Sequence, residues 1–152
     1  MIDIKTLRVG SHILVNGKRE RVRGLDEDNG LIIRFPAEYV NANEVEPIPI
    51  TPDLLKELGF EDYKKTKYRE YYTKEIGEVR LVNIHGYQYR DKRITFYRMN
   101  YRRQDWGEMW HCSIAEYNAS TAGICIVRNL HEAEAFLALH CVELIKERIL
   151  KR

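Results

Sequence analysis

The chain has 152 residues, of which 44% are hydrophobic and 32% are charged. This composition excludes intrinsic disorder, and the length allows one ordinary domain or two very small ones. Lys and Arg number 25 against 23 for Asp and Glu, so a net charge of +2 does not by itself indicate a nucleic-acid or membrane protein. No apolar run approaches the roughly 20 residues that a membrane-spanning helix needs.

Three cysteines are too few, and odd in number, for a disulfide framework. The N-terminus has no basic segment followed by an apolar one, so the sequence predicts no secretory signal. Together these features favour reduced thiols and a cytoplasmic location.

Short strands and tight turns are expected in the first fifty residues. Strands are predicted at 12–15 and 18–25, because Asn16-Gly17 between them is a strong hairpin signal. Further strands are predicted at 31–35 and 44–48. Short strands joined this tightly favour a small SH3-like barrel or a meander.

All four prolines lie between residues 36 and 52, and the segment 47–50 reads as an extended connector. It predicts a boundary between an SH3-like unit at 1–48 and an α+β unit at 49–152. Thr51-Pro52-Asp53 then has the composition of a helix start, and Gly59 that of its end.

Period-two patterns return after the short helix. They predict strands at 68–73, 79–84, 94–101, 108–115 and, more weakly, 124–127. Asn129 with Glu132 has the spacing of a capping box, and apolar residues then recur at helical spacing toward the basic C-terminus. The predicted class is therefore α+β: an antiparallel sheet packed by one short and one long helix.

Three motifs resemble a known set of sequences. They are Leu7-Arg8-Val9-Gly10 leading to Asn16-Gly17, Ile48-Pro49-Ile50-Thr51 leading to Leu58-Gly59-Phe60, and Val127-Arg128-Asn129-Leu130-His131 leading to Phe136-Leu137-Ala138-Leu139. In this order they are similar to short, uncharacterised proteins of bacterial prophages and mobile elements. The last motif departs from the family pattern. The resemblance implies a phage-like context and no catalytic residues.

One segment departs from the neutral charge balance. Residues 76–103 hold seven basic and two acidic side chains, with tyrosines among them. Arginines beside exposed rings suit single-stranded DNA or RNA, since guanidinium groups hold phosphates while rings stack on bases. The candidate residues are Arg90, Arg93, Tyr97, Arg98, Tyr101, Arg102 and Arg103. The same pattern also fits an ordinary two-faced strand with rings on the core and arginines in water.

A second candidate surface contains Trp106 and Trp110, because tryptophan is enriched in protein-binding hot spots. A core position at the end of a sheet is the more usual place for a tryptophan. His111-Cys112 does not form a catalytic pair, since neighbours on a strand point to opposite faces. No spacing typical of a metal site or a phosphate-binding loop occurs, so the sequence predicts no cofactor, no metal and no enzyme.

The leading hypothesis is a non-enzymatic interaction or accessory module of a phage-like element that binds an unknown protein partner. The alternative hypothesis is a single-stranded DNA- or RNA-binding protein that uses residues 87–103.

Overall fold

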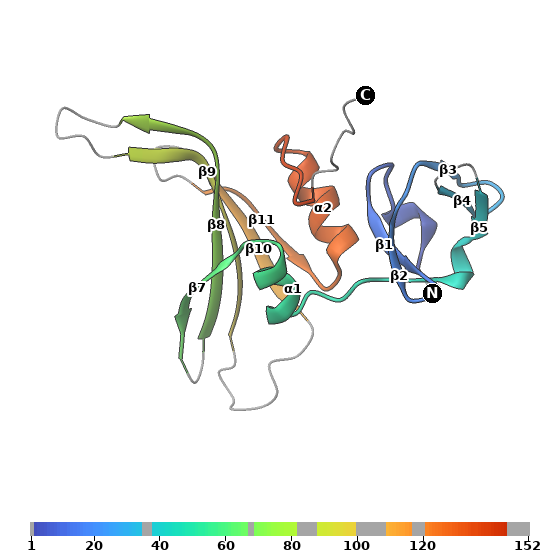
Figure 1. Cartoon of the computed structure of the whole chain (residues 1–152), viewed down its shortest axis with the longest axis horizontal. Coiled ribbons are helices and arrows are strands. Elements are labelled where there is room, and N and C mark those ends of the chain that lie inside the picture. The colour runs from blue at the N-terminus through green and yellow to red at the C-terminus, as the bar shows by residue number, and fades with distance from the viewer. Residues whose placement is uncertain are drawn as a thin grey trace, which may run out of the picture. The chain divides into compact units, whose positions relative to one another are not determined.

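A computed structural model describes residues 2–34, 38–66, 69–81, 88–99, 109–116 and 121–145 (Figure 1). These residues form an α+β structure of antiparallel sheets with two α-helices, which confirms the predicted class. None of the helices in these ranges is both long enough and apolar enough to cross a bilayer.

Two three-stranded sheets form the N-terminal region. One has the order β2-β1-β6, with β1 at His12–Val15, β2 at Lys18–Arg21 and β6 at Val45–Glu46. The other has the order β3-β4-β5, with β3 at Gly24–Asp26, β4 at Leu31–Arg34 and β5 at Glu38–Asn41. The described strands do not close into a barrel, and the SH3-like detail stays a prediction.

Local signals in this region act as predicted. Asn16 and Gly17 both have positive φ, at 50° and 79°, as the tight turn between β1 and β2 requires. Short 3-10 helices lie at Ile4–Thr6 (η1) and Ala42–Glu44 (η2). The strands enclose an apolar core formed by Ile2, Leu7, Ile13, Val15, Val22, Ile32 and Val45.

The connector leads directly into the first α-helix, α1 (Pro52–Glu57). Thr51 accepts a hydrogen bond from the Leu54 N–H at 3.1 Å, so it caps the helix as predicted. Gly59 has φ +91° just after the helix, a conformation that glycine adopts without strain.

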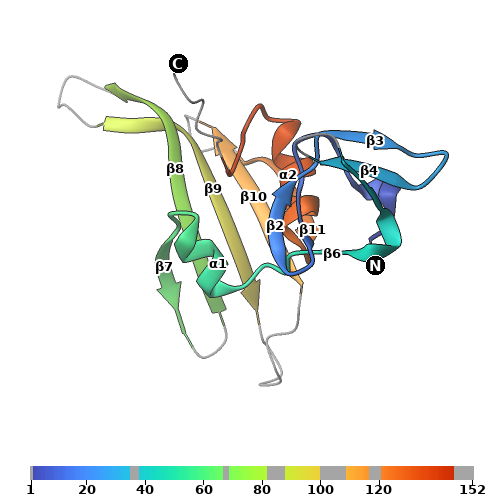
Figure 2. The same ribbon diagram turned by 45° about the vertical axis from the view of Figure 1, so that its right-hand side comes forward.

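A five-stranded antiparallel sheet of order β11-β10-β9-β8-β7 follows (Figure 2). Its strands are β7 (Glu61–Lys65), β8 (Arg69–Leu81), β9 (Gln88–Met99), β10 (Trp110–Glu116) and β11 (Thr121–Val127). The parts of the predicted strands 68–73 and 79–84 that are described, residues 69–73 and 79–81, belong to one long strand, β8, whereas residues 68 and 82–84 lie outside the described part. Strand β7 was not predicted, because a segment with four charges in five residues has no apolar alternation.

Strand β8 contains a glycine, Gly77, at a β-bulge, and the strand continues on both sides of it. The register of β8 and β9 shifts between Ile76 and Val79, and Gly77 adopts φ +92°. A Cβ atom at Gly77 would lie 2.8 Å from the Asp91 Cβ, so the position needs glycine. Beyond the bulge the two strands bend together (Figure 1).

The second α-helix, α2 (Leu130–Ala138), begins where predicted but ends early. The Glu132 carboxylate accepts the Asn129 N–H at 3.0 Å, which confirms the capping box. At the other end, Cys141 adopts φ +58° and the Val142 N–H reaches the Leu137 carbonyl at 3.1 Å. This is a Schellman closure, so the apolar residues after it lie outside a helix. Residues 146–152 of the predicted long helix lie outside the described part.

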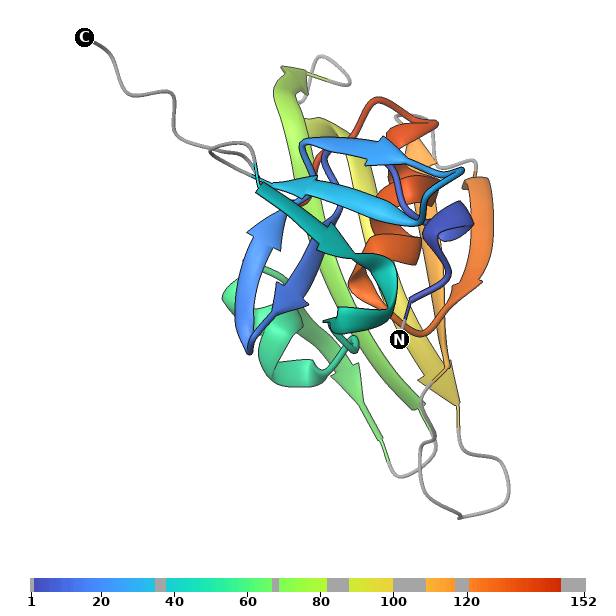
Figure 3. The same ribbon diagram turned by 90° about the vertical axis from the view of Figure 1, so that its right-hand side faces the viewer.

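Two compact units divide the chain: Met1–Pro49 with Arg128–Arg152, and Ile50–Val127. After the second unit the chain contributes its last residues to the first unit. This differs from the predicted division into 1–48 and 49–152. Helix α2 therefore belongs with the N-terminal strands, beside which it lies in Figure 3. The Leu130 N–H donates to the Ile48 carbonyl at 2.7 Å, and this long-range contact is invisible to a reading along the chain.

Candidate interaction surface on the five-stranded sheet

The five-stranded sheet has two faces of different character. On one face lie Tyr72, Phe96, Cys112 and Trp110, all of them buried. The segment that carries α1 covers this buried face, since Phe60 packs edge-on against Phe96 with ring centroids 5.2 Å apart. The opposite face, which we call the open face, contains no buried residue among the described side chains.

Three rings form a stacked row across the open face. The register places Tyr71 on β8 opposite Tyr97 on β9, and Tyr97 opposite His111 on β10. The ring centroids of Tyr71 and Tyr97 are 5.4 Å apart, and those of Tyr97 and His111 are 4.8 Å apart. Ile126 on β11 continues the row and is 54% exposed. The row thus joins three rings and an isoleucine from four neighbouring strands.

Tyr97 is the one residue of this row that the sequence predicted as a binding residue. Tyr71 and His111 lie 26 and 14 residues away from it, so only the strand register brings the three together. Period-two alternation shows that each residue shares a face with its own strand neighbours at i±2. It contains no information about which residues are opposite on the adjacent strand.

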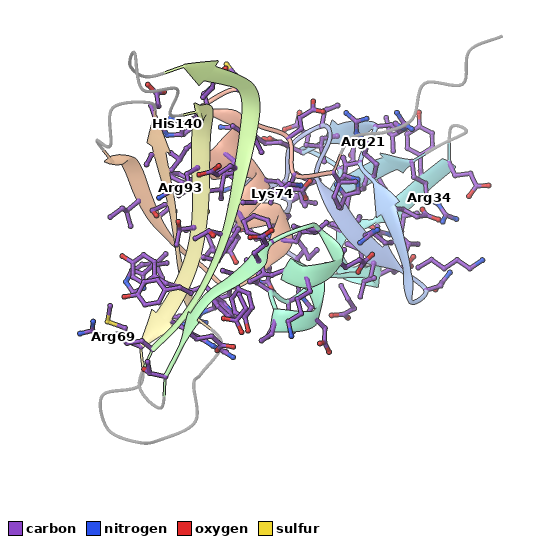
Figure 4. The ribbon with its side chains drawn as sticks, turned by 60° about the vertical axis from the view of Figure 1, so that its left-hand side comes forward. Arg21, Arg34, Arg69, Lys74, Arg93 and His140 are labelled. Atoms are coloured by element: carbon purple, nitrogen blue, oxygen red, sulfur yellow. The ribbon has the colours of Figure 1, made fainter. Side chains whose placement is uncertain are left out.

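A shallow hollow of about 700 Å³ lies next to the row. Tyr71, Thr73 and Thr95 line it, together with the charged pair Glu75 and Arg93. Figure 4 labels Arg93 on β9 and Arg69 near the start of β8. The hydroxyl and methyl groups of the two threonines that line it suit both hydrogen bonds and apolar contact.

Arg98, a predicted phosphate ligand, is engaged on the buried face. Its Nε donates to Glu70 Oε2 at 2.8 Å, and its guanidinium carbon lies 4.2 Å from the centre of the Trp110 ring. The Tyr72 hydroxyl donates to the other oxygen of Glu70 at 2.5 Å. Burial, followed by the bond to Glu70, raises the pKa of the Tyr72 hydroxyl. Arg98 therefore stabilises a buried carboxylate.

Arg93, a second predicted phosphate ligand, lies on the open face. Its Nη2 donates to Glu75 Oε1 at 2.8 Å, and both side chains are about half exposed. A carboxylate this close lowers the attraction of Arg93 for a phosphate, although solvent screens the pair.

Trp110 is fully buried, so it does not contribute to a protein-binding patch. Its indole N–H donates to the Ile50 carbonyl at 3.0 Å, and its ring packs edge-on against Tyr72. The core interpretation of this residue is the correct one. The side chain of Arg90, together with Tyr101, Arg102, Arg103 and Trp106, lies outside the described part of the chain.

The positions of His111 and Cys112 do not support a catalytic pair or a shared metal site. His111 lies on the open face, whereas Cys112 is buried on the other, as strand geometry requires. Burial raises the pKa of the Cys112 thiol, and neighbouring Cys125 adds to the effect. Within the described ranges, no three His, Cys, Asp or Glu side chains gather as a metal site would need.

The contacts of two histidines in the other unit were also not predicted. Glu134 on α2 accepts from the His12 N–H at 2.8 Å and lies 2.7 Å from His12 Nδ1. His131 Nε2 lies 3.1 Å from Thr6 Oγ1, while its Nδ1 is buried without a hydrogen-bond partner. Both contacts hold α2 against the N-terminal segment.

Comparisons of the chain with protein-family models, curated proteins and solved structures return no match. The resemblance to prophage proteins thus stays a prediction.

Proposed function

We propose that the chain is a non-enzymatic interaction module that binds a protein partner on the open face, and that it serves a phage-like or mobile element. The single observation that carries the protein-binding part is the row Tyr71–Tyr97–His111–Ile126. The phage-like context comes from the sequence motifs alone.

The composition of the open face suits a protein surface. Tyrosine, methionine and arginine are enriched in protein interfaces. Tyr71, Tyr97, Met99, Arg69 and Arg93 all lie on this face at positions that are at least partly exposed. Two exposed isoleucines, at 124 and 126, enlarge its apolar part.

The geometry of the rings favours a protein over a nucleic acid. A base stacks on a free ring face. Tyr97 lies between Tyr71 and His111, which come from the strands on either side, so both of its faces are covered. The row therefore offers ring edges, which suit side-chain contacts. Of the predicted phosphate ligands whose side chains are described, Arg98 pairs with Glu70 and Arg93 with Glu75.

Photo-cross-linking tests this proposal. A photoreactive amino acid at Thr95, in the hollow, is expected to capture a protein partner in cells that carry the element. The same residue at Tyr39, which is 65% exposed in the other unit, is the matched control. A partner captured at both positions, or at neither, would contradict docking on this face.

Two charge variants then separate the classes of partner. A long side chain at Thr95 blocks a protein contact whatever its sign, so both Thr95→Arg and Thr95→Glu should weaken binding at least about tenfold, a loss of about 1.4 kcal/mol. A nucleic acid would respond in opposite directions, because phosphates attract Arg and repel Glu. An oligonucleotide that binds more tightly to Thr95→Arg and less tightly to Thr95→Glu would favour the alternative.

A further inference from the structure

Strand β11 forms one edge of the five-stranded sheet. Its inner side pairs with β10 from Trp110↔Val127 to Ala115↔Thr121. Within the described ranges, no other strand or loop donates a backbone hydrogen bond to its outer side or accepts one from it. A row of backbone donors and acceptors is thus available for another strand.

The two edges of the sheet differ in charge. Strand β7, at the opposite edge, has the sequence EDYKK, with four charged residues out of five. Strand β11 has the sequence TAGICIV, with none. Natural proteins protect an exposed edge with charges or proline, because a long apolar edge pairs with other chains. Only β7 carries such protection.

Two large side chains on β11 are also exposed. Ile124 is 55% and Ile126 is 54% exposed, although strands usually place β-branched apolar residues against a neighbour. Both lie on the same face, at positions i and i+2. Within the described residues, the edge therefore combines backbone groups that have no strand partner with an apolar strip.

We propose that β11 pairs with β11 of a second copy of this chain, in antiparallel orientation about a two-fold axis. A strand that pairs with itself must not oppose like charges, and an uncharged strand meets this condition at every register. The register centred on Cys125 places Ile124 of each copy opposite Ile126 of the other. That register covers all four exposed isoleucines with one another.

The charged edge explains why such an assembly would close. A two-fold contact uses the same edge of both copies and leaves only the two β7 edges outside. Those edges carry charged residues at four of five positions, and these charges would lose water on pairing with a further strand, so the product is a discrete dimer with a continuous sheet. This inference goes beyond the proposed function, because it concerns backbone pairing along the edge of the sheet, although Ile124 and Ile126 also belong to the open face.

Sedimentation equilibrium of the full chain tests the dimer. The wild type is expected to show a monomer–dimer equilibrium below about 1 mM, a concentration at which even weak complexes are populated. Ile124→Lys should raise the dimer dissociation constant at least about tenfold, because each lysine would replace the apolar contact of Ile124 with Ile126 of the other copy. Val9→Lys, at an apolar residue 65% exposed in the other unit, should leave the constant unchanged.

Amide hydrogen exchange adds a backbone readout. Outward amides of β11 should exchange more slowly as the wild-type concentration rises, and this dependence should vanish in Ile124→Lys. Near-ultraviolet circular dichroism of the buried Trp110 checks that the variant is folded. A chain that stays monomeric near 1 mM, a dimer that persists in Ile124→Lys, or open-ended assembly would overturn the proposal. A monomer that still binds its partner at Thr95 would overturn the dimer alone.

Discussion

Two arginine–glutamate pairs join β8 to β9, and they differ in little except burial. Glu70 is the direct register partner of Arg98, and Glu75 that of Arg93. Both pairs have an N–O distance of 2.8 Å. The side chains of the first are 1% and 14% exposed, whereas those of the second are 44% and 52% exposed. The same chemistry therefore operates in two different environments.

The difference teaches that position on a face decides what an arginine does. On the buried face, Arg98 neutralises Glu70, and Tyr72 completes the hydrogen bonding of the carboxylate. A buried charge without such partners would cost several kcal/mol. On the open face, water solvates both members of the second pair, so little energy depends on their contact. Four experiments test this comparison.

Breaking the buried pair should have the largest effect. Glu70→Ala leaves the Arg98 guanidinium without its carboxylate in a largely buried position, so we expect the free energy of unfolding to fall by about 3–5 kcal/mol. Urea denaturation followed by tryptophan fluorescence measures the change. A loss below about 1 kcal/mol would mean that burial does not distinguish the two pairs.

Removing the indole N–H of Trp110 should have an intermediate effect. Trp110→Phe leaves the Ile50 carbonyl without its donor and weakens the contact of Arg98 with the ring. The expected loss is about 1–3 kcal/mol, measured by thermal or urea unfolding. Met109→Ala, at the exposed neighbour, is the control and should change stability by less than about 0.5 kcal/mol.

His131 extends the comparison to a buried group whose hydrogen bonding is incomplete. Thr6 Oγ1 donates to the Asp3 carbonyl at 2.6 Å, so it accepts from His131 Nε2 and leaves Nδ1 unprotonated. Protonation would create a buried donor at Nδ1 without an acceptor. Burial accordingly lowers the pKa of His131, although Glu132 and Glu134 oppose the change.

This predicts a pH dependence with a definite sign. Below pH 6.5 the unfolded chain binds a proton at His131 more readily than the folded chain, so stability falls as the pH decreases. One group contributes at most about 1.4 kcal/mol per pH unit. Denaturation between pH 7 and pH 5 should show a smaller loss in His131→Gln than in the wild type. Equal losses in the two proteins would contradict this role for His131.

Breaking the exposed pair should have the smallest effect. Glu75→Ala is the matched counterpart of Glu70→Ala, and its expected cost is under about 1 kcal/mol because water solvates Arg93. The same urea denaturation measures it, and screening by added salt should reduce the cost further. A cost equal to that of Glu70→Ala would remove the distinction between the faces.

Local signals in the sequence predicted much of the fold. The turn at Asn16-Gly17 and the caps at Thr51 and Asn129 depend on backbone conformation and on hydrogen bonds three residues away. Period-two alternation was strong enough to predict most of β10 and parts of β8 and β9, whereas residues 88–93 of β9 were not predicted as a strand. Strand β7 could not be found in this way, because its charges hide any alternation.

The sequence by itself determined that Tyr97 and Arg98 lie on opposite faces of a strand, because alternation in a strand is local. Only the tertiary structure decided which face α1 covers, which rings meet across strands, and that α2 returns to the N-terminal unit. These outcomes depend on contacts between residues far apart in the chain. Such contacts form where the apolar face of one helix or strand packs against that of another. The residue pattern within one element identifies its apolar face but not the element that covers it.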